Sequence, residues 1–116
     1  MHCIGTTYVF VGGGFQGLCD LDPGTGVKEY ESQGYDDAYL SRFDASGNLV
    51  WVRVWGDCDY DEVFSIDDDA NGFVYACGEF GGTIDFDPGT GIYELESNGT
   101  MPDPYLMQLK STGLWY

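Results

Sequence analysis

Three oxygen-bearing side chains stand at alternate positions in Asp67, Asp69 and Asn71, directly before Gly72. Alternate carboxylate and amide oxygens of this kind converge on a calcium ion when a glycine lets the backbone curl around it. The glutamate that would complete an EF-hand loop is missing, because Gly78 occupies its position. A β-turn in which an aspartate binds its own backbone amides explains the same residues. The pattern therefore predicts a turn and leaves a calcium site at Asp67, Asp69 and Asn71 as the alternative.

A second acidic run contains Asp57, Asp59, Asp61 and Glu62. It has no glycine at the point where a calcium loop would curl around its ion. We therefore expect this run to be an exposed link between two structural units.

Two pairs of carboxylates, Asp20 with Asp22 and Asp85 with Asp87, each precede a Pro-Gly turn. Paired carboxylates could act as the acid and base of a glycoside hydrolase. A catalytic pair needs one distinctive environment that separates its two pKa values, whereas these residues occur in two copies. We therefore expect Asp22 and Asp87 to accept hydrogen bonds from turn amides.

The remaining sequence shows no complete catalytic constellation. His2 is the only histidine, and there is no Ser-His-Asp or Cys-His set, phosphate-binding loop or zinc spacing. The four cysteines show no paired spacing, so we expect small, mostly unpaired core fillers. The sequence accordingly predicts no catalytic residues, no enzyme, and no cofactor other than the calcium alternative.

The charge of the chain limits its partners. The formal net charge is -16, from 20 acidic and 4 basic residues. A surface this negative repels nucleic-acid phosphates and anionic lipid heads. No run is apolar and long enough to span a bilayer, and the first residues do not resemble a secretory signal. We therefore expect neither nucleic acid nor membrane insertion.

The carboxylate pairs are positioned by an internal repeat. Asp20 and Asp85 lie 65 positions apart, and about half of the residues in 8–34 recur in 73–99. Self-similarity at a fixed period is typical of solenoids, propellers and arrays.

Short apolar segments separated by glycine-containing turns predict an all-β protein. In residues 49–55 the valines face one way and Trp51, Arg53 and Trp55 face the other, so we expect packing on both faces of this strand. Residues 1–7 are too short and mixed to assign. The predicted strands cover residues 8–15, 18–21, 27–31, 38–43, 48–55, 62–66, 73–80, 104–109 and 114–116.

Three segments carry a family resemblance. They are Ser65-Ile66-x-x-Asp69-x-x-Gly72-x-Val74-Tyr75-x-x-Gly78, then Asp85-Phe86-Asp87-Pro88-Gly89, and Asp37-Ala38-x-Leu40-x-x-Phe43-Asp44-x-x-Gly47-Asn48-Leu49-x-Trp51. Together they resemble the bacterial SBBP-type, or seven-bladed, β-propeller repeat, in about two copies that cover nearly the whole chain. Members of that family are typically large exported or cell-surface bacterial proteins without shared catalytic residues. The resemblance implies two tandem four-stranded antiparallel blades.

On this interpretation residues 1–56 form blade one, with an inner strand that is missing or partial and an insertion hairpin at 18–31. Residues 57–116 form blade two, with a truncated outer strand and an insertion hairpin at 83–96. Closed propellers have roughly four to eight blades. The chain is therefore expected to be part of a longer protein or to assemble as a homo-oligomer.

The resemblance implies a non-catalytic scaffold of an exported or cell-surface bacterial protein, with other blades, copies of itself, or a protein or carbohydrate ligand as partners. One alternative is a calcium-stabilised adhesive or carbohydrate-binding module, in which Trp51, Trp55 and Trp115 could stack on sugars. A less favoured alternative is a glycosidase or lyase propeller, which would need a non-repeating carboxylate pair. Asp37 and Asp103 are the residues with which to test it.

Overall fold

The computed structural model describes residues 2–4, 8–57, 59–69, 71–87, 92–97, 102–110 and 112–113. Within these residues every regular element is a β-strand, so the all-β prediction is confirmed. The strands are β1 (His2–Ile4), β2 (Tyr8–Phe15), β3 (Leu18–Asp20), β4 (Glu29–Glu31), β5 (Asp37–Asp44), β6 (Leu49–Trp55), β7 (Glu62–Asp68), β8 (Phe73–Phe80), β9 (Thr83–Asp85), β10 (Glu94–Glu96) and β11 (Asp103–Lys110).

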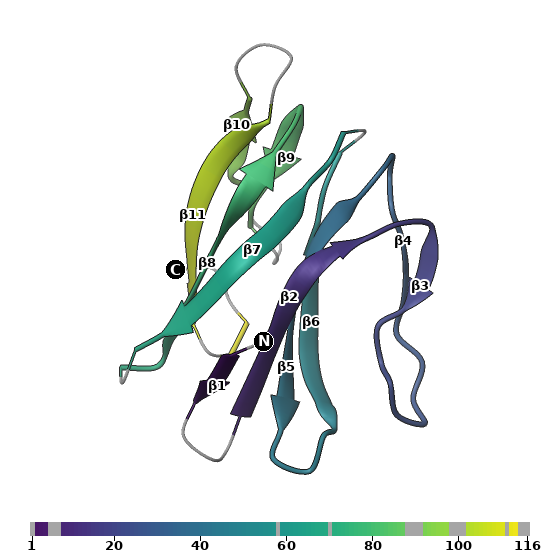
Figure 1. The fold of residues 1–116 in the computed structure, drawn as a ribbon, viewed down its shortest axis with the longest axis vertical. Coiled ribbons are helices and arrows are strands. Elements are labelled where there is room, and N and C mark those ends of the chain that lie inside the picture. Colours follow the sequence, from purple (N-terminus) through teal and green to yellow (C-terminus); the bar gives the residue numbers. More distant parts are fainter. Residues whose placement is uncertain are drawn as a thin grey trace.

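The described strands form two main sheets and two short ladders (Figure 1). Sheet one has the order β1-β2-β5-β6, and sheet two has the order β11-β8-β7. The ladders β3-β4 and β9-β10 extend from them as hairpins, and none of the four closes on itself. All of these pairings are antiparallel. The additional strand predicted at residues 114–116 lies outside the described part of the chain.

Strand β1 falls within residues 1–7, which the sequence pattern left unassigned. It pairs His2 with Phe10 and Ile4 with Tyr8 along the edge of β2. A strand of three residues is too short to show a period, so its place depends on the backbone groups that β2 offers. Sheet one therefore has four strands.

The repeat extends to the pairing register. Phe15 of β2 faces Asp37 of β5, and Phe80 of β8 faces Asp103 of β11. Equivalent residues of the two copies are 65 positions apart in β2 and β8, and 66 positions apart in β5 and β11. One inserted residue between the strands therefore leaves the register of the two units equivalent.

Residues 44–47 form a tight turn between β5 and β6. Asp44 Oδ1 accepts hydrogen bonds from the backbone N–H groups of Ser46 and Asn48, both at 2.9 Å. Gly47 closes the turn onto the Asp44 carbonyl at a φ of 85°, and Gly113 closes the equivalent turn onto the Lys110 carbonyl at 87°. A side chain rarely adopts this left-handed conformation, which explains glycine at both positions.

Sheet one packs face to face against sheet two. A Cβ atom at Gly12 of β2 would lie 2.8 Å from Ile66 Cδ1 and 2.9 Å from Val63 Cγ1 of β7, so a side chain here would force these methyl groups to shift. Trp55 of β6 meets Tyr105 of β11 edge-on, with ring centroids 6.2 Å apart. The common core contains Phe10, Ala38, Leu40, Trp51, Trp55, Val63, Val74, Ala76, Phe80, Ile84, Phe86, Tyr105, Met107 and Leu109.

Candidate functional site

The repeated aspartate motif closes the two hairpins, which we call arm one (β3 and β4) and arm two (β9 and β10). In arm one, Asp20 Oδ1 accepts backbone hydrogen bonds from Asp22 at 3.0 Å and from Lys28 at 2.9 Å. In arm two, Asp85 Oδ1 accepts the matching pair, including one from Tyr93 at 2.9 Å. The first aspartate of each pair therefore holds the two sides of its arm together.

A glycine and a serine close the base of each arm. The Gly17 N–H donates to Ser32 Oγ at 2.8 Å, and the Ser32 N–H donates to the Gly17 carbonyl at 3.0 Å. Gly82 and Ser97 form the same two bonds, both at 2.9 Å. The serine that ends each Glu-x-Glu-Ser segment therefore hydrogen-bonds to the backbone at the base of its own arm.

In arm one the second aspartate of the motif accepts fewer of the described hydrogen bonds than the first. Asp22 Oδ1 accepts one bond from the Gly24 N–H at 2.9 Å, as predicted. Asp20 accepts two backbone hydrogen bonds, from Lys28 and Asp22, and these bonds lower its pKa. The turn next to Asp87 includes residues 88–91, which lie outside the described residues, so the prediction for its turn amides stays a prediction.

Asp69 of the predicted calcium loop is engaged by the protein itself. Its Oδ1 accepts hydrogen bonds from the Asn71 and Phe73 backbones at 2.9 and 3.2 Å, and its Oδ2 accepts one from the Tyr75 hydroxyl at 2.8 Å. The Tyr75 bond is the main reason why the pKa of Asp69 is lowered. The nearby Asp67 lies in β7, and its carboxylate accepts the N–H of the next residue.

These contacts are those of a turn, and calcium at Asp67, Asp69 and Asn71 stays a prediction. In the part of the chain that the structure describes, no group of three or more His, Cys, Asp and Glu side chains has the geometry of a metal site.

The link between the sheets contains the most buried carboxylate. Asp61 is 0% exposed, so the prediction that this acidic run is exposed is wrong for this residue. Its N–H donates to the Asp36 carbonyl at 2.8 Å. Its carboxylate accepts the N–H groups of Asp57 at 2.9 Å and of Gly81 at 3.1 Å. Asp61 is buried because its hydrogen bonds connect the residue before β5, the link and the residue after β8.

The same link also reaches arm two. Asp57 Oδ2 accepts the N–H of Thr83, the first residue of β9, at 3.1 Å. Tyr60 stacks on Tyr35, with ring centroids 4.6 Å apart. The link is therefore bonded to both units rather than merely spanning them.

Asp37 lies at the start of β5 and is only 2% exposed. Its Oδ2 accepts the Gln33 N–H at 3.3 Å, whereas its Oδ1 has no hydrogen-bond partner among the described residues. Burial raises its pKa, and the charges of Asp57 and Asp36 raise it further. A buried carboxylate oxygen without a donor favours the protonated acid or a bound cation.

Two neighbouring acids, Asp61 and Glu62, follow the same pattern. Burial raises the pKa of Asp61 to about 6, with further contributions from the charges of Asp37 and Asp57. Burial also raises the pKa of Glu62, helped by a hydrogen bond to the Asp36 carboxyl group and by the charges of Asp36 and Glu79. We refer to the whole group as the acidic junction. Its members are Asp36, Asp37, Asp57, Asp61, Glu62 and Glu79.

A cavity of about 360 Å³ adjoins the acidic junction. Asp37, Asp85 and Asp87 supply carboxylates to its wall, while Tyr30 and Trp55 supply aromatic surface. The cavity brings arm one, arm two and the first turn after β6 together. A polar or cationic group is the ligand that such a wall fits best.

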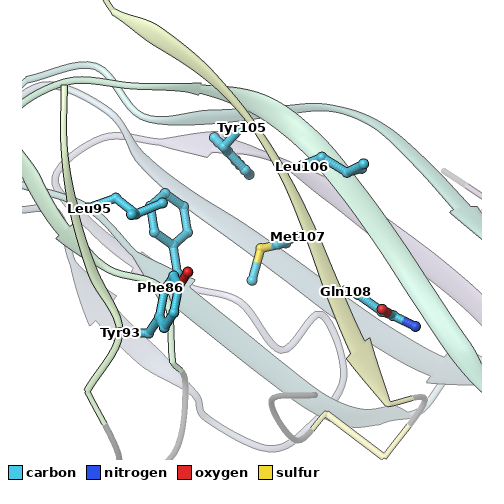
Figure 2. A pocket seen from close by; sticks show the side chains of 7 residues that line it. All are labelled: Phe86, Tyr93, Leu95, Tyr105, Leu106, Met107 and Gln108. Carbon is cyan, nitrogen blue, oxygen red and sulfur yellow. The ribbon is translucent and has the colours of Figure 1, made fainter. Parts of the chain in front are cut away.

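A smaller apolar cleft of about 190 Å³ lies between arm two and β11 (Figure 2). Phe86 and Tyr93 of the arm lie on one side of it, and Met107 of β11 lies on the other. Leu106 lies on the opposite side of its strand from Met107. Phe86 is held by an edge-on contact with Phe80, at 5.2 Å between ring centroids.

A scan against models of protein families, a search of curated proteins and a search of solved structures each found no match. Within the described residues, none of the elements is a helix of the length and hydropathy that crossing a membrane requires.

Proposed function

We propose that the chain is a pair of β-propeller-type repeat units that serves as a non-catalytic scaffold in an exported or cell-surface bacterial protein. The observation that carries this proposal is the use of the repeated polar residues. Asp20 and Asp85, and likewise Ser32 and Ser97, make the same backbone bonds in both units. Residues that recur in order to build an arm are structural signatures rather than members of one reactive site.

The face-to-face packing of the sheets supports the same proposal. In a repeat architecture each unit covers a face of its neighbour, and the acidic link joins one unit to the next. Other units of the parent chain, or copies of it, are then the natural partners. A protein or carbohydrate ligand would be held on the surface between the arms.

The experiment measures glycosidase activity and the fold in variants of Asp37 and Asp103. The Asp37→Asn and Asp103→Asn variants are assayed with the wild type against a panel of aryl glycosides and polysaccharides. The scaffold proposal expects no turnover that depends on either residue, together with unchanged circular dichroism. Turnover that disappears in Asp37→Asn while the fold is retained would establish the glycosidase or lyase alternative instead.

A calcium-stabilised module is the second candidate. The sequence feature that favours it is the alternation of oxygen-bearing side chains at Asp67, Asp69 and Asn71, directly before Gly72. If this module exists, calcium raises the melting temperature, EDTA reverses the effect, and Asp67→Asn abolishes it. A melting curve that is the same in calcium and in EDTA removes this candidate.

A further inference from the structure

Asp37 has surroundings that its equivalent in the second unit lacks. In the pairing register Asp37 lies opposite Phe15 and Asp103 lies opposite Phe80, so the two aspartates occupy the same position of the repeat. Asp37 is 2% exposed and lines the cavity beside the acidic junction, whereas Asp103 is half-buried and does not line it. Because the repeat does not reproduce this burial, it is not one of the structural signatures that both units share.

The carboxyl group of Asp37 lacks a hydrogen-bond donor on the side of Gly56. Its Oδ2 accepts the Gln33 N–H at 3.3 Å, and its Oδ1 has no partner among the described residues. Outside the residues next to it in the chain, the atom nearest to a Cβ placed at Gly56 would be Asp37 Oδ1. Gly56 and Gln33 both line the cavity. The oxygen without a donor therefore lies at the wall of a space from which a ligand can supply one.

The rest of the cavity wall combines negative charge with aromatic surface. Glu31, Asp85 and Asp87 add carboxylates, and none of the described residues that line the cavity is basic. Tyr30 and Trp55 add aromatic rings to the same wall. Aromatic rings attract cations, and they also pack against the apolar stem of a long charged side chain.

We propose that this cavity binds an organic cation, an ammonium or guanidinium group on an apolar stem, with Asp37 as its buried counter-ion. The inference rests on the scaffold proposal, because it names the ligand held between the arms. An N–H group of the cation supplies the hydrogen bond that Asp37 Oδ1 lacks, and a charge-assisted bond of this kind is stronger than a neutral one. The stem of the ligand packs on Tyr30 and Trp55.

An organic cation suits this wall better than a metal ion does. In the ranges that the structure describes, no group of three or more His, Cys, Asp and Glu side chains has metal-site geometry. The carboxylates of the wall come from β4, from the start of β5 and from arm two with its turn. Ammonium and guanidinium groups each carry several N–H donors, so one ligand can bond to carboxylates from different elements.

Binding should strengthen as the pH rises through the titration of Asp37. Burial raises the pKa of Asp37, and the charges of Asp57 and Asp36 raise it further. A cation binds the ionised carboxylate, so it competes with the proton and lowers this pKa. The other acids of the cavity and the junction ionise in the same direction and add to the attraction; they are Glu31, Asp61, Glu62, Glu79, Asp85 and Asp87.

NMR titration of the isotope-labelled chain at pH 7 tests the proposal with three probes. Nα-acetyl-lysine amide carries its ammonium group on a side chain, butylamine carries it on a free stem, and Nα-acetyl-norleucine amide is uncharged. The net charge of -16 attracts any cation, so the titrations use about 0.15 M salt to screen this attraction. The backbone amides of Gln33 and Gly56 and the carboxyl carbon of Asp37 report on the cavity.

Both charged probes are expected to shift these signals and to lower the pKa of Asp37, and the uncharged probe is expected to do neither. Asp37→Asn should weaken binding by about 10-fold or more, the loss of one charge-assisted hydrogen bond. The matched variant Asp103→Asn should bind as the wild type does. If the lysine derivative binds more tightly than butylamine, the ligand is a side chain of a protein; if it does not, the ligand is a free amine.

The proposal is overturned if the charged probes leave the pKa of Asp37 unchanged or if the uncharged probe shifts the same signals equally. Binding that is the same in Asp37→Asn and Asp103→Asn would also overturn it. The pKa is measured in the wild type, so this test does not depend on the folding of Asp37→Asn. None of these outcomes concerns turnover, so the scaffold proposal is tested separately by the activity assay of Asp37 and Asp103.

Discussion

Asp37 and Asp61 lie at the junction of the two sheets as almost completely buried carboxyl groups, and the charge of Asp37 raises the pKa of Asp61. Asp61 is satisfied by the backbones of Asp57 and Gly81. Asp37 has one carboxylate oxygen without a described donor. The place where the two units meet is therefore also where burial raises the pKa of two carboxyl groups.

The stability of the fold should fall as the pH rises through the titration of Asp61. Its pKa is raised from 3.8 to about 6, so the folded chain binds this proton more tightly than the unfolded chain. The resulting stabilisation is complete below about pH 4 and is lost as the pH rises through about 6; it amounts to roughly 1–3 kcal/mol. Urea unfolding at half-unit pH steps measures it. Asp61→Asn should flatten the curve between pH 4 and 7, and an unchanged slope in that variant would contradict the assignment.

A side chain should destabilise the protein more at Gly12 than at its neighbour Gly13. An alanine Cβ at Gly12 would press on Val63 and Ile66, but one at Gly13 would lie 3.5 Å from the nearest atom of Tyr39, which is ordinary contact. We expect Gly12→Ala to lower the free energy of unfolding by about 1–3 kcal/mol, the range for overpacking, relative to Gly13→Ala. Chemical denaturation of both variants gives the comparison. Equal losses would mean that the sheets do not meet at Gly12.

Arm one should open when Asp20 is replaced. Asp20→Ala removes two bonds that cross or close the arm, whereas Asp22→Ala removes the single described bond to Gly24. Limited proteolysis should therefore cut residues 21–28 several times faster in Asp20→Ala than in Asp22→Ala. The melting temperature of the whole domain should change little in either variant. Equal cleavage rates would show that Asp20 does not stabilise arm one more than Asp22 does.

The Asp69 turn should respond to its tyrosine rather than to calcium. Tyr75→Phe removes the hydroxyl that donates to Asp69 Oδ2, so the pKa of Asp69 should rise toward its ordinary value. Titration of the Asp69 carboxyl carbon by NMR, with and without calcium, measures this. A calcium-dependent shift at Asp69 in the wild type would instead support the loop predicted at Asp67, Asp69 and Asn71.

The strands could be predicted from sequence because the apolar alternation and the glycine turns are local. The prediction for residues 8–15 matches β2, and that for residues 73–80 matches β8. The burial of Asp61 could not be predicted, because its partners Asp36 and Gly81 are brought to it only by the packing of two sheets. From its own residues alone, an acidic run without a glycine is predicted to be exposed to solvent.

In the arms, too, part of the hydrogen bonding could not be predicted from the sequence. The repeat indicated that Asp20 and Asp22 are structural, but it could not show which of them makes the cross-arm bond. That choice depends on the register of β3 against β4, which brings the Lys28 N–H to Asp20 rather than to Asp22. The equivalence of Asp37 and Asp103 appears only in the pairing register, in which each lies opposite a phenylalanine, Phe15 or Phe80. The burial of Asp37 depends on the link that follows sheet one.

The packing of the two units against each other is tested most directly by NMR contacts across the junction. Nuclear Overhauser effects are measured between the Gly12 α-protons and the methyl groups of Val63 and Ile66, and between the Trp55 and Tyr105 rings. The account predicts strong contacts at all of these places, together with those inside each sheet. Contacts within β2-β5 and β7-β8 without any between Gly12 and β7 would contradict it, because the units would then fold without meeting face to face.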